Sequence, residues 1–436
     1  MKTVRNYQRL TIKVLSASII SLTTLSAFAI EGTIEKEAPR SDVEVAIVPF
    51  AGAENINGVV TNDLTIGGHN VTDKNLPQNP HTSSEVKLDL WRQNAVPYLV
   101  VGRSQTDRGD VALNFEVIDV NSGAVKGTGS VLTRGRSADA LRMGGHRVAE
   151  RIEEILTGKK GDFSGRLAFV VESGTPSKHN QSLWVSDVDG YNPQMIQRVN
   201  GTISGLNPSA NGRTFTYVVQ QVGYPVVYSA DVNGEGGTLL TPFRGNNLGA
   251  SVSPDGSSVL FSSDYQTGKP QIYLSRGASV QRLTNDPVGA VYPSWSPDGN
   301  SFVYTSDRAG GAKGGNKGQI YRYNLSTRTE ERLTGGGLSS MGKISNDGRK
   351  MSFLIGTQQG AVMDLQSRSI SSVNNVGLEE PPSISPNGQH YLYSNGNMLT
   401  ISTNGKTVQL RPTGIPAGKI LSPIWLNPNA NNSMTP

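Results

Sequence analysis

The sequence predicts a small α/β domain followed by an all-β propeller of six blades built from WD40-like repeats. Three observations lead to this fold class. Strand and helix patterns alternate over residues 43–160. Helical periodicity then disappears, and a signature of Ser/Asn-Pro-Asp/Asn-Gly type recurs over residues 161–430. The two ends of the repeat region each contain an incomplete unit, and the two pieces complement each other.

The first 29 residues are typical of an export signal. A basic stretch through Lys13 precedes the apolar run VLSASIISLTTLSAFAI, and Ala27-Phe28-Ala29 has the small-x-small pattern of a cleavage site. A membrane anchor is the alternative, but a spanning helix needs about 20 mostly apolar residues, and Ser and Thr dilute this run. We therefore predict cleavage after Ala29 and an exported protein.

Composition excludes several classes of protein. Four of the 40 basic residues and none of the acidic ones lie in the first 29 residues, so the net charge of +5 falls to +1 without them. That balance gives no reason to expect nucleic-acid binding. The chain has no cysteine, so it forms no disulfide and carries no lipid on a cysteine. Residues 30–42, IEGTIEKEAPRSD, are polar and predict a flexible arm.

The predicted α/β domain begins at Val43. VEVAIVPF (43–50) and VPYLVVG (96–102) read as buried strands. In VALNFEVIDV (111–120) apolar residues alternate, and the turn at residues 121–123 indicates a hairpin. The stretch 137–158 predicts a helix that begins after Ser137 and ends at Gly158, and another helix is expected over roughly 83–94. The apolar stripe of the first of these helices comprises Val148, Ile152, Ile155 and Leu156.

The repeat follows the period of a four-stranded propeller blade. Its signature appears as LNPSANGRTFTYV, VSPDGSSVLFSS, WSPDGNSFVYTS, ISNDGRKMSFLI and ISPNGQHYLYS. The Asp or Asn before each glycine is at positions 211, 255, 298, 347 and 387, so the gaps are 44, 43, 49 and 40 residues. A sixth unit, 166–199, lacks the signature, whereas PIWLNP (423–428) resembles PSWSP (293–297) but has no strands after it. The C-terminal segment is therefore expected to supply the missing inner strand and close the ring, which removes free sheet edges.

The stretch SWSPDGNSFVYTSDR (294–308) could hold a catalytic Ser and Asp, a cation loop or a turn. Pro297, Asp298 and Gly299 suit a tight turn. Equivalent positions hold Asn211, Asp347 and Asn387, and a catalytic carboxylate would be neither repeated in each blade nor replaced by Asn. Asp264 and Asp307 lie in equivalent Ser-Asp pairs and are interpreted as turn residues too. They lack the closely spaced oxygen ligands of a calcium loop, although a cation in the central channel stays open.

Other motifs for chemistry are weak. AGGAKGGNKGQI (309–320) departs from the phosphate-loop pattern and precedes a strand, so a hairpin loop is expected. No His-Glu-x-x-His motif or Gly-x-Ser-x-Gly elbow occurs. We predict no catalytic residue, no metal site and no cofactor. The five histidines are scattered along the sequence: His69, His81, His146, His179 and His390.

The order of these features resembles the TolB family of the Tol-Pal envelope system. The resemblance rests on an exported start, an arm, a domain opening on AIVPF, and the segments LVVGRSQ and FEVIDV. The junction HRVAERIEEILTGKKGDFSGRLAFVVES and six SPDG-type repeats complete it. It implies a non-enzymatic periplasmic scaffold that acts in outer-membrane constriction during cell division and in envelope integrity. The implied partners are the peptidoglycan-associated lipoprotein (Pal), TolA and, for some chains, bacteriocins; membrane association would run only through partners.

The resemblance also implies where the partners bind. Pal is expected at the loops that lead into the inner strands, with TolA at the arm. The family often has His where this chain has Asn246. The expected Pal-binding residues are Asn246, Asn247, Gly249, Ala290, Val291, Tyr292, Glu379 and Glu380. The expected TolA-binding residues are Ile30, Glu31, Ile34 and Asp42.

Two other functions remain open from the residues alone. A propeller hydrolase or metal-dependent lactonase would need converging acids or a nucleophile with a base, and no such set stands out. A carbohydrate-binding propeller would favour exposed aromatic side chains on one face. The four tryptophans are Trp91, Trp184, Trp295 and Trp425, and the repeat places the last two on inner strands.

Overall fold

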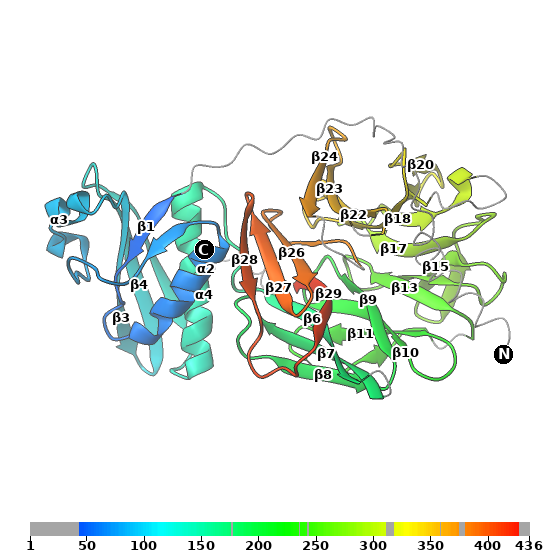
Figure 1. The fold of residues 1–436 in the computed structure, drawn as a ribbon, viewed down its shortest axis with the longest axis horizontal. Coiled ribbons are helices and arrows are strands. Elements are labelled where there is room, and N and C mark those ends of the chain that lie inside the picture. Colours follow the sequence, from blue (N-terminus) through cyan, green and yellow to red (C-terminus); the bar gives the residue numbers. More distant parts are fainter. Residues whose placement is uncertain are drawn as a thin grey trace.

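The computed structural model describes residues 43–175, 178–234, 236–241, 244–310, 318–357, 359–374 and 380–426. Within them, an N-terminal domain lies beside a propeller (Figure 1). The predicted export signal, the arm through Asp42, Glu379 and the last residues of the predicted propeller, 427–430, lie outside the described residues. So do residues 311–317 of the predicted hairpin loop.

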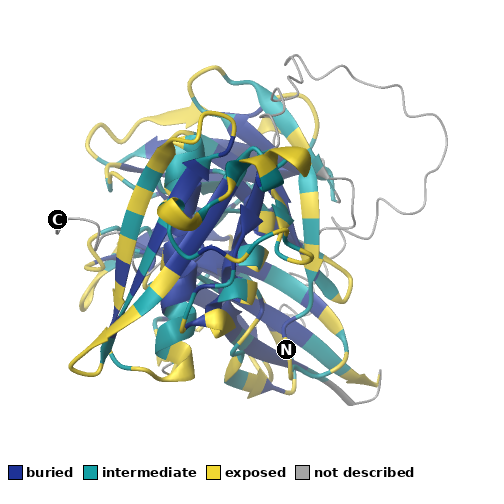
Figure 2. Ribbon diagram, turned by 90° about the vertical axis from the view of Figure 1, so that its left-hand side faces the viewer, coloured by how far each residue is buried: buried dark blue, intermediate teal, exposed yellow. Residues whose placement is uncertain are grey.

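The N-terminal domain is built on a five-stranded mixed sheet in the order β2-β1-β3-β4-β5. Its strands are β1 (Glu44–Ile47), β2 (Asn70–Thr72), β3 (Tyr98–Asp107), β4 (Asp110–Asp119) and β5 (Val125–Thr133). The alternation in β4 is confirmed, because Val111, Leu113, Phe115 and Val117 are all buried in one core. Figure 2 looks at the molecule from this domain's side and shows buried strands surrounded by exposed loops and helix surfaces.

Helices cover both faces of this sheet. They are η2 (Glu54–Ile56), α2 (Asn57–Ile66), η3 (Ser83–Glu85), α3 (Leu88–Gln93) and α4 (Ala138–Thr157). The prediction for α4 is confirmed at both ends: the Ser137 side chain accepts a hydrogen bond from the Ala140 amide, and Gly158 is left-handed. Its predicted stripe packs into the core, with Val148 and Ile152 buried and the other two residues partly buried.

The prediction of one helix over 83–94 was wrong in detail. The segment contains η3 and α3, separated by Val86, whose backbone is extended (φ −72°, ψ 123°). Val86 instead packs with Trp91 in the core on the far face of the sheet.

Helix α2 was not predicted, because NGVVTNDLTI is rich in Asn, Gly and β-branched residues that disfavour helix. Burial of five of its residues in tertiary contacts overrides that local preference.

The described part of the propeller consists of six four-stranded sheets. The first sheet contains β29 (Lys419–Leu426), β6 (Arg166–Thr175), β7 (Lys178–Asp187) and β8 (Gln194–Val199). The second and third comprise β9 (Thr202–Pro208), β10 (Thr214–Gln220), β11 (Val226–Asp231) and β12 (Thr238–Leu239), then β13 (Asn247–Val252), β14 (Val259–Ser263), β15 (Gln271–Arg276) and β16 (Ser279–Arg282). The fourth and fifth comprise β17 (Ala290–Trp295), β18 (Ser301–Ser306), β19 (Gln319–Asn324) and β20 (Glu330–Arg332), then β21 (Ser339–Ile344), β22 (Lys350–Ile355), β23 (Gln359–Asp364) and β24 (Ile370–Asn374). The sixth comprises β25 (Ser383–Ile384), β26 (His390–Asn395), β27 (Met398–Thr403) and β28 (Lys406–Leu410), and η4 (Arg308–Gly310) follows β18.

The ring closes as predicted. Strand β29, near the C-terminus, pairs antiparallel with β6 from Lys419↔Glu172 to Leu426↔Arg166. Its residues Ile420, Ile424, Trp425 and Leu426 are at most 1% exposed. The C-terminal strand thus supplies the inner strand of the first blade.

The two domains share a hydrophobic core. Helices α2 and α4 lie between the N-terminal sheet and the propeller (Figure 1), and their apolar residues join a cluster with residues of β6, β26, β27 and β29. Polar contacts cross the junction as well: Thr403 Oγ1 donates to the Ile66 carbonyl at 2.8 Å, and Lys406 Nζ donates to the Gly68 carbonyl at 3.0 Å. The scattered histidines converge here, because His69, His146 and His390 are buried where the domains meet.

Candidate protein-binding site at the propeller channel

The inner strands of five described blades contain a β-bulge next to a residue with left-handed backbone. These residues are Gly205 in β9, Gly249 in β13, Tyr292 in β17, Met341 in β21 and Ser422 in β29, with φ between +51° and +145°. Such a conformation is uncommon for Tyr, Met or Ser. A bulge bends its strand and re-aims a side chain, and these bulges occur at equivalent places around the ring. The propeller therefore shapes its channel by repeated local strain.

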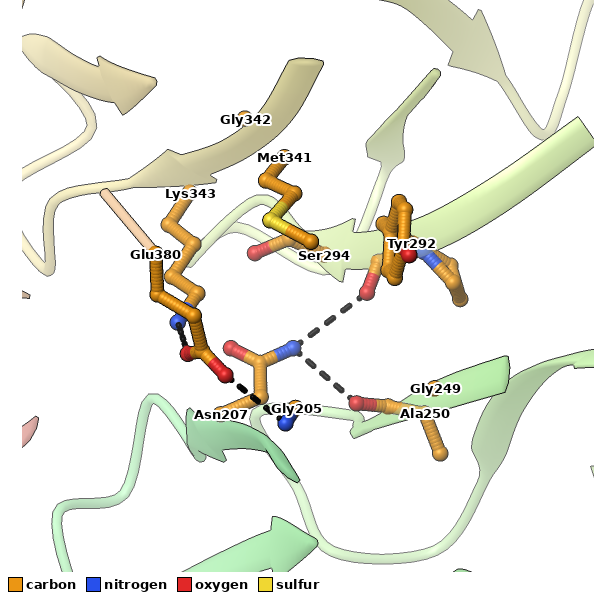
Figure 3. A pocket seen from close by; sticks show the side chains of 11 residues that line it. Gly205, Asn207, Gly249, Ala250, Tyr292, Ser294, Met341, Gly342, Lys343 and Glu380 are labelled. Atoms are coloured by element: carbon orange, nitrogen blue, oxygen red, sulfur yellow. Dashed lines mark hydrogen bonds and ion pairs between the residues drawn. The ribbon is translucent and has the colours of Figure 1, made fainter. Parts of the chain in front are cut away.

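The residues at the bulges surround a narrow cavity in the channel. Its lining comes from β9, β13, β17, β21 and the approach to β25, as Figure 3 shows: Gly205, Asn207, Gly249, Ala250, Tyr292, Pro293, Ser294, Met341, Gly342, Lys343 and Glu380. The cavity holds about 30 Å³, which is room for a water molecule or two. An organic substrate does not fit into this cavity. A large partner would have to bind at the mouth of the channel, which is the entrance formed by the loops that lead into the inner strands.

Glu380 connects strands from opposite sides of the channel. Its Oε1 accepts from the Gly205 amide at 2.9 Å and from Ser422 Oγ at 2.7 Å. Its Oε2 lies 3.5 Å from Lys343 Nζ, which also donates to the Leu206 carbonyl at 2.7 Å. One carboxylate thus joins β9, β29 and β21, and its charge is balanced by a lysine inside the channel.

Asn207 and Tyr292 complete the polar lining. Asn207 Nδ2 donates to the carbonyls of Ala250, at 3.0 Å, and Pro293, at 3.2 Å, as the dashed lines in Figure 3 show. Burial, with a smaller contribution from the Glu380 carboxylate, raises the pKa of Tyr292 to about 12. The phenol is therefore neutral at physiological pH and can donate a hydrogen bond.

The structure brings together only part of the residue set expected to bind Pal. Gly249, Tyr292 and Glu380 line the cavity. Val291 precedes Tyr292 on β17 and is partly buried, and Ala290 is fully buried. These two residues can therefore act chiefly through the position of their strand.

Asn246 and Asn247 hold the approach to β13 in place. Asn246 donates through its amide to Asp264 Oδ1 at 2.8 Å and through Nδ2 to Asp264 Oδ2 at 2.7 Å. Asn247 Nδ2 donates to the Pro225 carbonyl at 2.9 Å and is fully buried. Neither side chain lines the cavity, so both are positioned to support the loop rather than to contact a partner directly.

Sequence reasoning missed Asn207, Lys343 and Ser422. Asn207 and Lys343 each follow a left-handed bulge residue by two positions, Asn207 within the repeat signature and Lys343 directly before it, and Ser422 is itself the bulge residue. Their positions in the repeat are a signal that could have identified them, since the residues around each bulge face the channel. Their partners could not be read from the sequence, because Lys343 and Leu206 are 137 residues apart.

The residues rejected as catalytic are turn residues. The Gly299 amide donates to the Ser296 carbonyl at 3.0 Å, and Asp298 Oδ1 accepts from the Asn300 amide at 3.0 Å. The Asp255 turn repeats this pattern, and hydrogen bonds from Ser253 and Ser257 hold the pKa of Asp255 at about 2. The backbone carbonyls of Asp264 and Asp307 also accept turn hydrogen bonds, from Gly268 and Gly310. Trp295 and Trp425 lie on inner strands and are buried, as the repeat predicted.

Comparison with known proteins agrees with this architecture. Residues 153–427 match the family model of the TolB beta propeller domain, and residues 34–125 match that of the TolB amino-terminal domain. The chain belongs to the TolB family. The resemblance stated from the sequence is thereby confirmed, as is the fold class.

Relatives of the family align with part of this chain. A Tol-Pal system protein TolB from Bordetella parapertussis is 31% identical over 297 residues, which are 64% of this chain and 62% of the relative. One from Xanthomonas campestris is 30% identical over 246 residues, covering 53% of this chain and 55% of the relative. The aligned part therefore spans less than two thirds of these relatives' length.

A solved structure matches over almost the whole fold. The crystal structure of TolB from Acinetobacter baumannii has a TM-score of 0.76 and 28% sequence identity, and the match covers 91% of this chain and 98% of that one. The TolB-family chain described here thus has both domains in the same arrangement of elements. Among its described residues, no helix has the length and apolar character needed to span a membrane.

Proposed function

We propose that this chain is a non-enzymatic periplasmic scaffold of the Tol-Pal system. It binds the peptidoglycan-associated lipoprotein Pal through the mouth of the propeller channel and TolA through residues 30–42. In this role it serves outer-membrane constriction during cell division and envelope integrity, and bacteriocins are further candidate ligands of the same mouth. Support comes from family membership and from relatives named as Tol-Pal system proteins.

One observation carries the location of the Pal site. Gly249, Tyr292 and Glu380 come from three separate blades, and they converge on one cavity in the channel. The end of the inner strand β25 faces the N-terminal domain, since Asn387 Nδ2, in the turn after β25, donates to the Lys160 carbonyl at 2.8 Å. The start of β25, where Glu380 lies, therefore points away from the N-terminal domain. A rigid ring of loops around a narrow channel suits a protein partner better than a small substrate.

Titration calorimetry of the periplasmic domain of the cognate Pal into residues 30–436 tests this location. We expect saturable one-to-one binding, and Tyr292→Ala should weaken it at least about tenfold, because buried tyrosines often dominate interface affinity. Tyr191→Ala is the matched control: its side chain is 48% exposed and lies at the end of the propeller near Arg142. That control should bind like the natural chain.

Two results would count against the proposal. If the folded chain does not bind Pal, the scaffold function fails. If Pal binds but neither Tyr292→Ala nor Glu380→Gln changes the affinity, Pal contacts another part of the propeller.

The arm is tested with a chain that starts at Val43. This chain should keep its fold but lose binding to the periplasmic part of TolA. Its affinity for Pal should be unchanged or higher.

A further inference from the structure

A group of charged side chains is buried between the two domains. We call it the interdomain charge cluster. Asp63 extends from α2, Arg142 and His146 come from α4, and the propeller contributes Arg166 of β6 with Asp187 and Asp189 at and after the end of β7. Their side chains are between 0% and 18% exposed.

Ion pairs in this cluster cross the domain boundary. Arg142 Nε lies 3.3 Å from Asp187 Oδ2, and another nitrogen of the same guanidinium pairs with Asp189 Oδ2. Arg166 NH1 lies 3.2 Å from Asp187 Oδ1. Both oxygens of Asp187 therefore face a guanidinium, and Arg142 binds the N-terminal domain to the propeller.

The charges of the cluster do not balance while His146 is neutral and Asp63 is ionised. Asp63, Asp187 and Asp189 carry three negative charges against two positive ones on the arginines. Uncompensated buried charge is costly. His146 Nδ1 lies 2.7 Å from Asp63 Oδ2, a ring nitrogen of His146 lies within 4.8 Å of oxygens of Asp187 and Asp189, and Nε2 has no hydrogen-bond partner among the described residues. One proton on the imidazole would make the cluster neutral.

We propose that the junction is a proton-dependent latch: the two domains dock firmly while His146 is an imidazolium, and docking weakens when alkaline pH removes that proton. The proton belongs to the Asp63–His146 pair as a unit. Its loss leaves one net negative charge buried between α2, α4 and the end of β7. The latch is independent of the proposed function, since it requires no partner.

The surroundings of His146 support a retained proton. Burial alone would lower the pKa of His146, but the carboxylates of Asp63, Asp189 and Asp187 outweigh it and raise that pKa above its ordinary value. Burial also raises the pKa of Asp63 to about 7, which keeps a proton within the pair. The remaining facing groups are Arg142, Arg166 and Glu150, and Glu150 accepts from Ser164 N at 2.8 Å and Ser164 Oγ at 2.7 Å.

The sign of the pH dependence follows from a raised folded-state pKa. The His146 proton stabilises the docked domains fully below the unfolded-state pKa of about 6.5. This stabilisation is lost as pH rises through the folded-state pKa of His146. Ligand-type atoms of His146, Asp187 and Asp189 lie within 4.8 Å of one another. The arginines already occupy the carboxylate oxygens, however, and this favours a proton over a divalent cation.

NMR titration of ¹³C-histidine-labelled chain, residues 30–436, tests the protonation directly. The chain has five histidines, and the His146 signal is assigned by its absence in His146→Gln. We expect it to titrate above pH 6.5. A His146 signal that is already neutral at pH 6 would overturn the proposal.

Hydrogen exchange tests the latch itself. After correction for intrinsic exchange, protection of residues 57–66 and 138–157 should fall about tenfold for each pH unit above the His146 pKa. His146→Gln should remove this dependence and the control His81→Gln should keep it. If His146→Gln does not fold, Asp189→Asn serves instead: it balances the cluster without a proton and should give pH-independent protection. An unchanged pH dependence in Asp189→Asn, or protection restored at pH 8.5 by Zn²⁺, would overturn the proton latch.

Discussion

At the scale of single residues, His390 occupies a place where a charged imidazolium would be poorly compensated. Its ring stacks on Trp425, with centroids 5.3 Å apart and planes at 13°, and Phe163 lies on another side at 5.8 Å. Nδ1 shares a hydrogen bond with Thr403 Oγ1 at 2.7 Å. Burial, with a smaller contribution from His69, lowers the pKa of His390 to about 3. Its neutral form is therefore part of the folded junction.

Acid should destabilise the protein through His390. The folded-state pKa of His390 is depressed, so neutral His390 contributes fully to the free energy of unfolding above the unfolded-state pKa of about 6.5. This contribution is lost as pH falls toward 3, at about 1.4 kcal/mol per pH unit. Urea unfolding at pH 7 and pH 5 measures the loss. His390→Gln should be less stable at pH 7 but should lose less on acidification, while His81→Gln should resemble the natural chain. Equal losses in both variants would contradict this role for His390.

At the scale of elements, α4 supports both the domain core and the junction. Its first turn is capped by Ser137, whose Oγ accepts from the Ala140 amide at 3.2 Å, and its last turn ends at left-handed Gly158. Between them the helix presents Val148 and Ile152 to the core and His146 to Asp187 and Asp189 of the propeller. The ends of this one helix thus fix the position of the interdomain charge cluster.

Ser137→Ala should therefore weaken the fold. Loss of an N-cap hydrogen bond costs about 1 kcal/mol of unfolding free energy. Urea unfolding followed by circular dichroism measures it, with Ser84→Ala as the control, because Ser84 is exposed and, among the described residues, its hydroxyl is hydrogen-bonded only to Thr82. A Ser137→Ala variant as stable as the control would show that the cap is dispensable in the packed helix.

The sequence allowed elements with local signals to be predicted. Ser137 and Gly158 mark helix ends, and Asp298-Gly299 marks a turn, because neighbouring residues alone determine these features. Helix α2 was missed, since its formation depends on burial of Val60 and Leu64 against distant segments. The channel was predicted only in part for the same reason: Glu380 meets Gly205 across 175 residues, a pairing that no local pattern encodes.

At the scale of the whole molecule, ring closure depends on one strand. Without β29 the first blade would expose the edge of β6, and two core clusters would lose Ile420, Ile424, Trp425 and Leu426. Exposed strand edges favour aggregation. A chain ending at residue 418 should therefore lose cooperative thermal unfolding and aggregate, whereas a chain ending at residue 430 should unfold cooperatively. Size-exclusion chromatography and calorimetry compare the two, and a soluble, cooperative shorter chain would show that closure is not required.

The same pairing sets an order of events during biosynthesis. Arg166 pairs with Leu426, so the first blade is completed only by a strand that is synthesised some 260 residues later. Contacts of such long sequence separation form slowly. Every chain that is cut short before β29 keeps the edge of β6 unpaired. Closure of the ring is therefore possible only in a chain that has been made through to its last strand.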